Sequence, residues 1–143
     1  MYVTYRPEGG EERRWVFEPG KVRASRAEMI EKRAGENWDS WLASVQMGSM
    51  KARRVLLWHL LSLDHPTLRF EDVDFLAGEL VVEHSAAELA EIRARVCAAK
   101  LPDDQREQVL AVLDAEIEAA REREGRDGGE GKASSKRSGS ATP

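Results

Sequence analysis

Paired cysteines and long apolar runs are both missing from this sequence of 143 residues. Its single cysteine, Cys97, cannot form an internal disulfide. Because Cys97 falls within a helical pattern, we expect a small buried thiol in a reducing compartment. The most apolar stretch, 55–63, is interrupted by His59 and Ser62 and is far shorter than the roughly 20 residues that cross a bilayer. The sequence therefore predicts neither a disulfide framework nor a membrane span.

An excess of charge of one sign is also missing. The chain has 22 Lys+Arg against 26 Asp+Glu, for a formal net charge of -4, and the two signs are closely mixed. This mixture lacks the single-sign field typical of proteins that bind nucleic acids or membrane surfaces. Residues 1–10 include Arg6 and Glu8, where a secretory signal needs an apolar run. We expect a small, soluble, intracellular protein with no nucleic-acid or membrane partner.

Catalytic and metal-binding motifs are not found either. His59, His65 and His84 have no cysteine, histidine or carboxylate at a spacing typical of metal ligands. The G-x-S-x-G, Walker-type and G-x-G-x-x-G patterns do not occur. Asp72 and Asp74 fit a solvated surface better than a general acid and base. The prediction is a non-enzymatic protein without a cofactor or metal.

The N-terminal residues predict a β-hairpin. Two segments, 2–6 and 13–17, are rich in aromatic and β-branched residues, and the Pro-Glu-Gly-Gly-Glu sequence between them has turn chemistry. Pro19 and Gly20 end the second strand.

Three helices should follow the hairpin. Ser25 and Glu28 match a capping box, which predicts a short helix from about residue 26 to 34. Asn37 can cap a second helix that stops near Gly48. A third, 49–64, is apolar on most of its circumference and is predicted to be the central core helix.

Residues 67–82 leave several interpretations open. Residues 68–70 alternate like a strand, and 72–76 could form one helical turn. Residues 80–82 could form another strand or an extended lead-in to the next helix.

The C-terminal part predicts a pair of helices and a polar tail. Ser85 and Glu88 match a second capping box, ahead of an amphipathic helix from about residue 86 to 100. The Leu-Pro-Asp-Asp break at 101–104 leads into another apolar stripe, and so short a connection predicts antiparallel helices. Residues 125–143 contain no large apolar side chain and are predicted to be disordered.

These patterns together predict a mainly α (α+β) fold, with an N-terminal β-hairpin, a compact bundle of about four to six helices and a disordered C-terminal tail. We divide the chain into a hairpin with helical core (1–84), a C-terminal helical hairpin packed on or extending that core (85–124), and the polar tail (125–143).

Aromatic and basic side chains are the candidates for a docking surface. The tryptophans lie within apolar patterns, which favours core packing, although aromatic residues are also enriched at interfaces. The start of the central helix is basic, and a helix start disfavours cations, so we expect these side chains to pair with acidic neighbours or an acidic partner. The residues are Trp15, Trp38, Trp41, Trp58, Lys51, Arg53 and Arg54.

The order of landmarks along 13–82 resembles the tail assembly chaperones of long-tailed, siphovirus-type phages or prophages of actinobacteria. A strand that ends Arg-Trp-Val-Phe-Glu-Pro is followed by a helix with Ala-Glu-Met-Ile-Glu. Gly-Glu-Asn-Trp, a second tryptophan, Gly-Ser-Met-Lys-Ala, Leu-Leu-Trp, Pro-Thr-Leu and Glu-Asp-Val-Asp come next. The pattern consists of scattered glycine, proline and aromatic positions and contains no catalytic signature.

The resemblance implies a protein that binds the tape measure protein and assists assembly of the tail tube. Its partners would be the tape measure protein and the tail tube protein, and it could form a homo-oligomer. It would act in the host cytoplasm during assembly and be missing from the mature virion. The family pattern assigns no binding residues. From aromatic and basic placement alone, the predicted partner-binding residues are Trp38, Trp41, Lys51, Arg54 and Trp58.

A frameshift site is a further expectation from the resemblance. Many members of this family are made in two lengths by a programmed ribosomal frameshift. The codons of Gly131 and Lys132 can form a slippery run, which makes this pair a possible frameshift site.

Two other functions stay open at this point. One is another phage structural part, such as a head-tail connector or tube component. The other is a small DNA-binding regulator built on residues 37–64, although the near-balanced charge argues against it.

Overall fold

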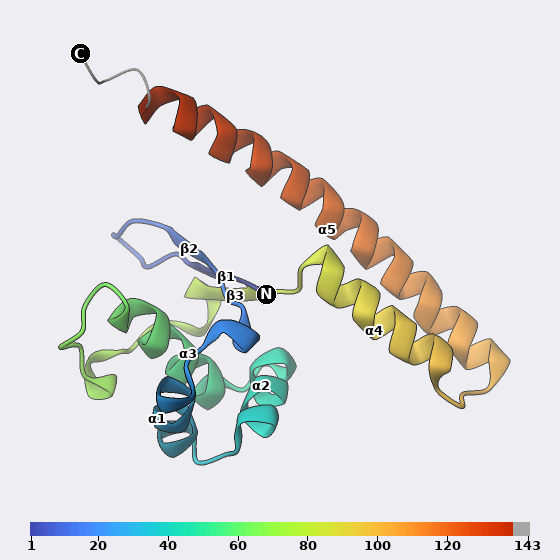
Figure 1. The fold of residues 1–143 in the computed structure, drawn as a ribbon, viewed down its shortest axis with the longest axis horizontal. Helices are drawn as coiled ribbons and strands as arrows, with labels where there is room; N and C mark the ends of the chain where they lie inside the picture. Colours follow the sequence, from blue (N-terminus) through green and yellow to red (C-terminus); the bar gives the residue numbers. More distant parts are fainter. Residues whose placement is uncertain (139–143) are drawn as a thin grey trace. The chain divides into compact units, whose positions relative to one another are not determined.

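A computed structural model describes the backbone of residues 1–138 and the side chains of residues 1–126. Within these residues the chain contains a three-stranded antiparallel sheet and five α-helices (Figure 1). It divides into two units, Met1–Glu83 and His84–Pro143, and each has its own apolar core. The predicted mainly α (α+β) class with an N-terminal β-hairpin is confirmed.

The sheet has the strand order β2-β1-β3. Strands β1 (Tyr2–Tyr5) and β2 (Arg13–Val16) form the predicted hairpin, and β3 (Leu80–Glu83) pairs with the other edge of β1. Of the two interpretations of 80–82, the strand is correct. The third strand supplies hydrogen-bond partners for the backbone groups of β1 that a lone hairpin would leave unpaired. It also adds stability, because isolated two-stranded hairpins are marginally stable.

Helices α1 (Ala24–Ala34), α2 (Trp38–Met47) and α3 (Met50–Ser62) complete the first unit. The central position predicted for α3 agrees with its burial, because every residue from 55 to 60 is buried. The Asn37 side chain accepts a hydrogen bond from the Ser40 amide at 2.9 Å, as a helix cap should.

The predicted capping box at the start of α1 is wrong. The helix begins at Ala24, and Ser25 and Glu28 lie inside it. The residue before it, Arg23, has an extended backbone, and its carbonyl accepts hydrogen bonds from the amides of Arg26 and Ala27. The short 3₁₀ helix η1 (Pro19–Lys21) leads the chain directly into this start.

Two side chains of α3 hold the irregular segment between α3 and β3. Trp58 donates from Nε1 to the Leu68 carbonyl at 3.2 Å, and Arg54 donates from Nε to the Val73 carbonyl at 2.6 Å. Only two short 3₁₀ helices form in this segment, η2 (Phe70–Asp72) and η3 (Ala77–Glu79). The helical turn considered for 72–76 is therefore not formed.

The second unit consists of α4 (Ala86–Ala98) and α5 (Asp103–Ser138). Their shared core contains Leu89, Leu113, Ile117 and Ala120. The predicted capping box is confirmed, since the Ser85 hydroxyl accepts from the Glu88 amide at 3.1 Å and the Glu88 carboxylate accepts from the Ser85 amide at 3.2 Å. The two helices run antiparallel, as the short connection predicted (Figure 1).

The prediction of a buried Cys97 is wrong, because this thiol is exposed on α4. Val96, its neighbour in sequence, packs against the core of the unit. One residue further along a helix is a rotation of about 100°, which turns Cys97 away from that core.

Helix α5 is longer than predicted, since it continues to Ser138 and does not end near Glu124. No proline lies between Pro102 and Pro143, so the backbone meets no strong helix stop. Disorder was predicted for 125–143. Of these residues, 139–143 and the side chains of 127–138 lie outside the described part of the chain. The possible frameshift pair, Gly131 and Lys132, also lies beyond residue 126, the last whose side chain the structure describes.

Candidate functional site

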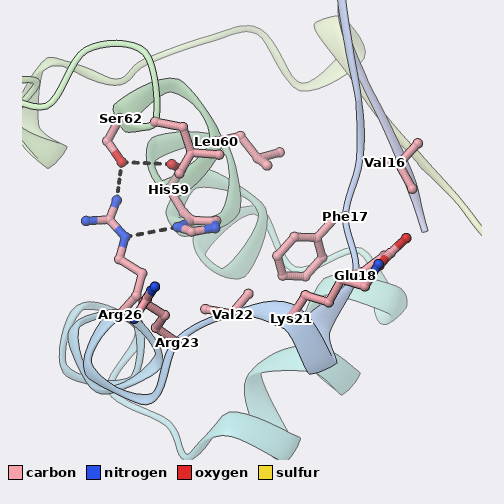
Figure 2. A pocket seen from close by; sticks show the side chains of 11 residues that line it. Val16, Phe17, Glu18, Lys21, Val22, Arg23, Arg26, His59, Leu60 and Ser62 are labelled. Atoms are coloured by element: carbon pink, nitrogen blue, oxygen red, sulfur yellow. Dashed lines mark hydrogen bonds and ion pairs between the residues drawn. The ribbon is translucent and has the colours of Figure 1, made fainter.

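The first unit contains an open pocket with a volume of about 590 Å³. It lies between the end of β2, the turn η1, the first turn of α1 and the last turn of α3 (Figure 2). The residues that line it are Val16, Phe17, Glu18, Lys21, Val22, Arg23, Arg26, His59, Leu60, Ser62 and Leu63. Two separate stretches of the sequence, 16–26 and 59–63, therefore build one concavity.

One wall of the pocket is apolar and ends in an exposed rim. Phe17 and Leu60 are each 3% exposed, and the Phe17 ring meets Trp41 edge-on with 6.1 Å between ring centroids. Val16 and Leu63 are each 61% exposed. Because successive side chains of a strand point to opposite faces, Phe17 turns into the core where Val16 turns outward. The pocket thus offers accessible apolar surface above a well-packed base.

The other wall is a hydrogen-bonded cluster of three side chains. Arg26 donates from Nε to Nδ1 of His59 at 3.0 Å and from Nη2 to the Ser62 hydroxyl, which in turn donates to the His59 carbonyl at 2.7 Å (Figure 2). The Arg26 guanidinium also lies over the Trp58 ring, 4.6 Å from its centroid. His59 and Ser62 are three residues apart on α3, which places both on one helix face toward α1.

Burial and the nearby charge of Arg26 lower the pKa of His59 to about 4. The imidazole is therefore neutral near pH 7 and can accept the hydrogen bond from Arg26. Since Nδ1 is the acceptor, the ring proton must be on Nε2. Burial also lowers the pKa of Arg26 from its usual value, although the guanidinium keeps its charge at neutral pH.

Two of the predicted partner-binding residues are core residues. Trp41 is 0% exposed and donates from Nε1 to the Ala52 carbonyl at 3.1 Å, and Trp58 is 5% exposed. The prediction that they belong to a docking surface is wrong, because both are packed into the core and neither lines the pocket described above. Both tryptophans follow the alternative that the sequence also favoured, core packing.

The other three predicted residues are less buried and differ in their surroundings. Trp38 is half-buried and lies against Trp41, with 5.2 Å between ring centroids. Arg54 is half-buried and stacks on Phe70 at 4.3 Å, so its role is to hold the segment after α3. Of these three residues, Lys51 alone is exposed.

The residues that line the pocket were not singled out as a site from the sequence. His59 stood out as an interruption of an apolar stretch and as a histidine without metal-ligand spacing. Ser62 stood out only as an interruption of the same stretch, and Arg26 only as a helix residue. The one available signal was a polar pair three residues apart on an otherwise apolar helix. Polar side chains on the buried face of a core helix need hydrogen-bond partners, and Arg26 is the partner of both His59 and Ser62.

Among the residues that the structure describes, no group of three or more His, Cys, Asp and Glu side chains is arranged to hold a metal ion. No helix in the same part of the chain has the length and apolar character to cross a membrane.

Comparison with known proteins gives no relative for this chain, since it matches no family model, no curated protein and no solved structure.

Proposed function

We propose that this chain is a tail assembly chaperone of a long-tailed actinobacteriophage or prophage, which binds the tape measure protein and assists tail tube assembly without catalysing a reaction. The landmarks that resemble this family lie within 13–82, inside the unit Met1–Glu83. The observation that carries the proposal is the open pocket of that unit, with its apolar wall and exposed apolar rim.

The pocket suits a partner that exposes apolar helical stripes. Such a helix presents side chains three and four residues apart, and these can enter a groove as successive anchors. The volume of about 590 Å³ lies within the range of about 300 to 1,000 Å³ that is typical of ligand sites. Val16 and Leu63 would lose solvent-exposed apolar area on contact, which favours association.

Co-expression with the tape measure protein tests the function. The wild-type chain should co-purify with the tape measure protein, and the double variant Val16→Ser with Leu63→Ser should lose it. Met47→Ser is the matched control, because Met47 is 86% exposed and does not line the pocket. Absence of co-purification with the wild-type chain would contradict the function, whereas retention by the double variant would contradict the role of the rim.

The proposed place of action is the host cytoplasm during assembly. Mass spectrometry of purified virions should therefore not detect the chain. A stoichiometric signal there would favour a head-tail connector or tube component. The nucleotides of codons 130 to 133, around Gly131 and Lys132, should contain a slippery heptamer if a longer frameshifted product exists.

A further inference from the structure

A nearly buried hydrogen-bond donor in the pocket has no partner among the residues that the structure describes. His59 is 5% exposed, and its Nδ1 is occupied by Arg26, which leaves the proton on Nε2. Nε2 makes no hydrogen bond within the described residues. It is not among the buried atoms without a partner there, so solvent or a ligand can reach it. Figure 2 shows the ring between Arg26 and Phe17, at the junction of the polar and apolar walls. A donor in this position is suited to an acceptor on a ligand.

The polar side of the pocket is also positively charged. Three basic side chains, Lys21, Arg23 and Arg26, line it against one acidic side chain, Glu18, which pairs with Lys21 at 2.6 Å. The hydrogen bonds that Arg26 makes go to uncharged groups, so no carboxylate among the described side chains offsets its charge. Arg23 likewise forms no ion pair within that part of the chain.

The backbone adds to this positive potential. Helix α1 starts at the pocket, immediately after Arg23, and its N-terminus has neither a side-chain cap nor an acidic residue in the first turn. The first amides of a helix attract anions when no cap satisfies them. The donor on His59, the uncapped helix start and two arginines, Arg23 and Arg26, that have no carboxylate partner among the described residues therefore favour the same kind of group, an anion.

We propose that the pocket binds a helical polypeptide segment in which apolar side chains lie next to a carboxylate. The apolar side chains pack on the exposed rim formed by Val16 and Leu63. The carboxylate accepts a hydrogen bond from His59 Nε2 and faces Arg23. A carboxylate matches the charge of this wall, whereas an apolar or basic neighbour does not. The identity of the polypeptide as the tape measure protein rests on the function proposed above, but the recognition chemistry does not.

Titration calorimetry of the full chain with synthetic peptides tests this recognition. The probe is an alanine-based helical peptide with leucines at positions i and i+3 and a glutamate at i+7, which share one helix face. Replacing the glutamate by glutamine should weaken binding about ten-fold, because a charge-assisted hydrogen bond becomes a neutral one. Replacing both leucines by alanine should weaken it by at least a similar factor. Equal affinity for the glutamate and glutamine peptides would overturn the proposal.

Variants of the pocket locate the effect. Arg23→Gln, at an exposed position, should weaken binding of the glutamate peptide about three-fold and leave the glutamine peptide unchanged. His59→Phe should abolish the preference for glutamate. Lys51→Gln is the control, since it removes one exposed positive charge outside the pocket. An equal loss with Lys51→Gln would show long-range attraction and contradict a local site.

A titration with octanoate in place of the peptide tests a second possible ligand, a small carboxylate with an alkyl chain. If octanoate binds in the pocket and the glutamate peptide does not, the polypeptide proposal is wrong and a free carboxylic acid is the ligand. The peptide titration and the co-purification can fail independently. Co-purification of the tape measure protein without a preference for the glutamate peptide would support the proposed function and contradict carboxylate recognition. A preference for the glutamate peptide without co-purification would support carboxylate recognition and contradict the proposed function.

Discussion

Arg26 donates a hydrogen bond from Nε to Nδ1 of His59 over 3.0 Å, across 33 residues of sequence. The bond joins the first turn of α1 to the last turn of α3 and determines which nitrogen of the imidazole keeps its proton. It also holds the guanidinium in place through an uncharged partner. The same contact therefore contributes to the stability of the first unit and to the chemistry of its pocket.

We expect the stability of the chain to fall between pH 6.5 and pH 4 in a way that depends on His59. Its pKa is about 4 in the folded chain and about 6.5 when unfolded, so in this window the unfolded state takes up a proton that the folded state does not. The contribution of His59 to the free energy of unfolding should drop by about 2 kcal/mol as the pH falls, allowing for solvent screening, and level off below pH 4.

Urea denaturation at pH 7 and pH 4.5, for the wild type and for His59→Gln, checks this dependence. The glutamine can still accept the hydrogen bond from Arg26 but does not titrate. The carboxylates titrate equally in both proteins, so the difference between the two pH effects isolates His59. Identical pH effects would contradict the low pKa.

Trp41→Ala should destabilise the first unit by about 3 to 5 kcal/mol, because it leaves a cavity in a closed core and removes the hydrogen bond to Ala52. Trp38→Ala should cost clearly less, since Trp38 is only half-buried. Thermal and urea unfolding of both variants measures the difference. Equal losses would show that the two rings contribute alike.

Gly48→Ala should lower stability by roughly 1 to 2 kcal/mol, the cost of a left-handed conformation for a residue with a Cβ. Gly48 ends α2 with φ of 91°, and the nearest atom to an added Cβ would be Nη2 of Arg53, at 4.0 Å, so the penalty is conformational and not steric. Gly78→Ala is the control, because that glycine has no positive φ and open space around it. A comparable loss in the control would refute this explanation.

Arg54→Met should loosen the segment between α3 and β3. The variant removes hydrogen bonds to the carbonyls of Val73 and Phe70 and the stacking on the Phe70 ring. Hydrogen exchange of residues 68–74 should accelerate in Arg54→Met and stay unchanged in Lys51→Met, which alters an exposed cation on the same helix. Unchanged exchange in both variants would mean that Trp58 holds the segment without help.

Local features of the fold could be predicted because their physics is local. A cap such as Asn37 needs only the amides of the next turn, and a strand next to a turn is recognisable from its residue types. The capping box of Ser85 and Glu88 and the hairpin of β1 and β2 belong to this class. The wrong start of α1 shows the limit, since a preceding turn placed the helix entrance at Arg23 in spite of a suitable motif.

The candidate site could not be predicted, because its parts are far apart in the sequence. Phe17, Arg26 and His59 meet only after the hairpin, α1 and α3 have packed. The tryptophans illustrate the same difficulty. Sequence spacing marks both Trp38 and Trp41 as apolar helix positions, but packing alone makes one half-buried and the other fully buried.

The sequence by itself determined the secondary structure of most of the chain, the balance of its charge and the mainly α class, since these depend on neighbours within a few residues. The tertiary structure decided that Leu80–Glu83 pairs with β1, that Trp41 and Trp58 are core residues, and that His59 keeps a free donor in a positively charged pocket. Each of these depends on contacts between distant segments, and the energy of such a contact depends on the geometry of the whole core.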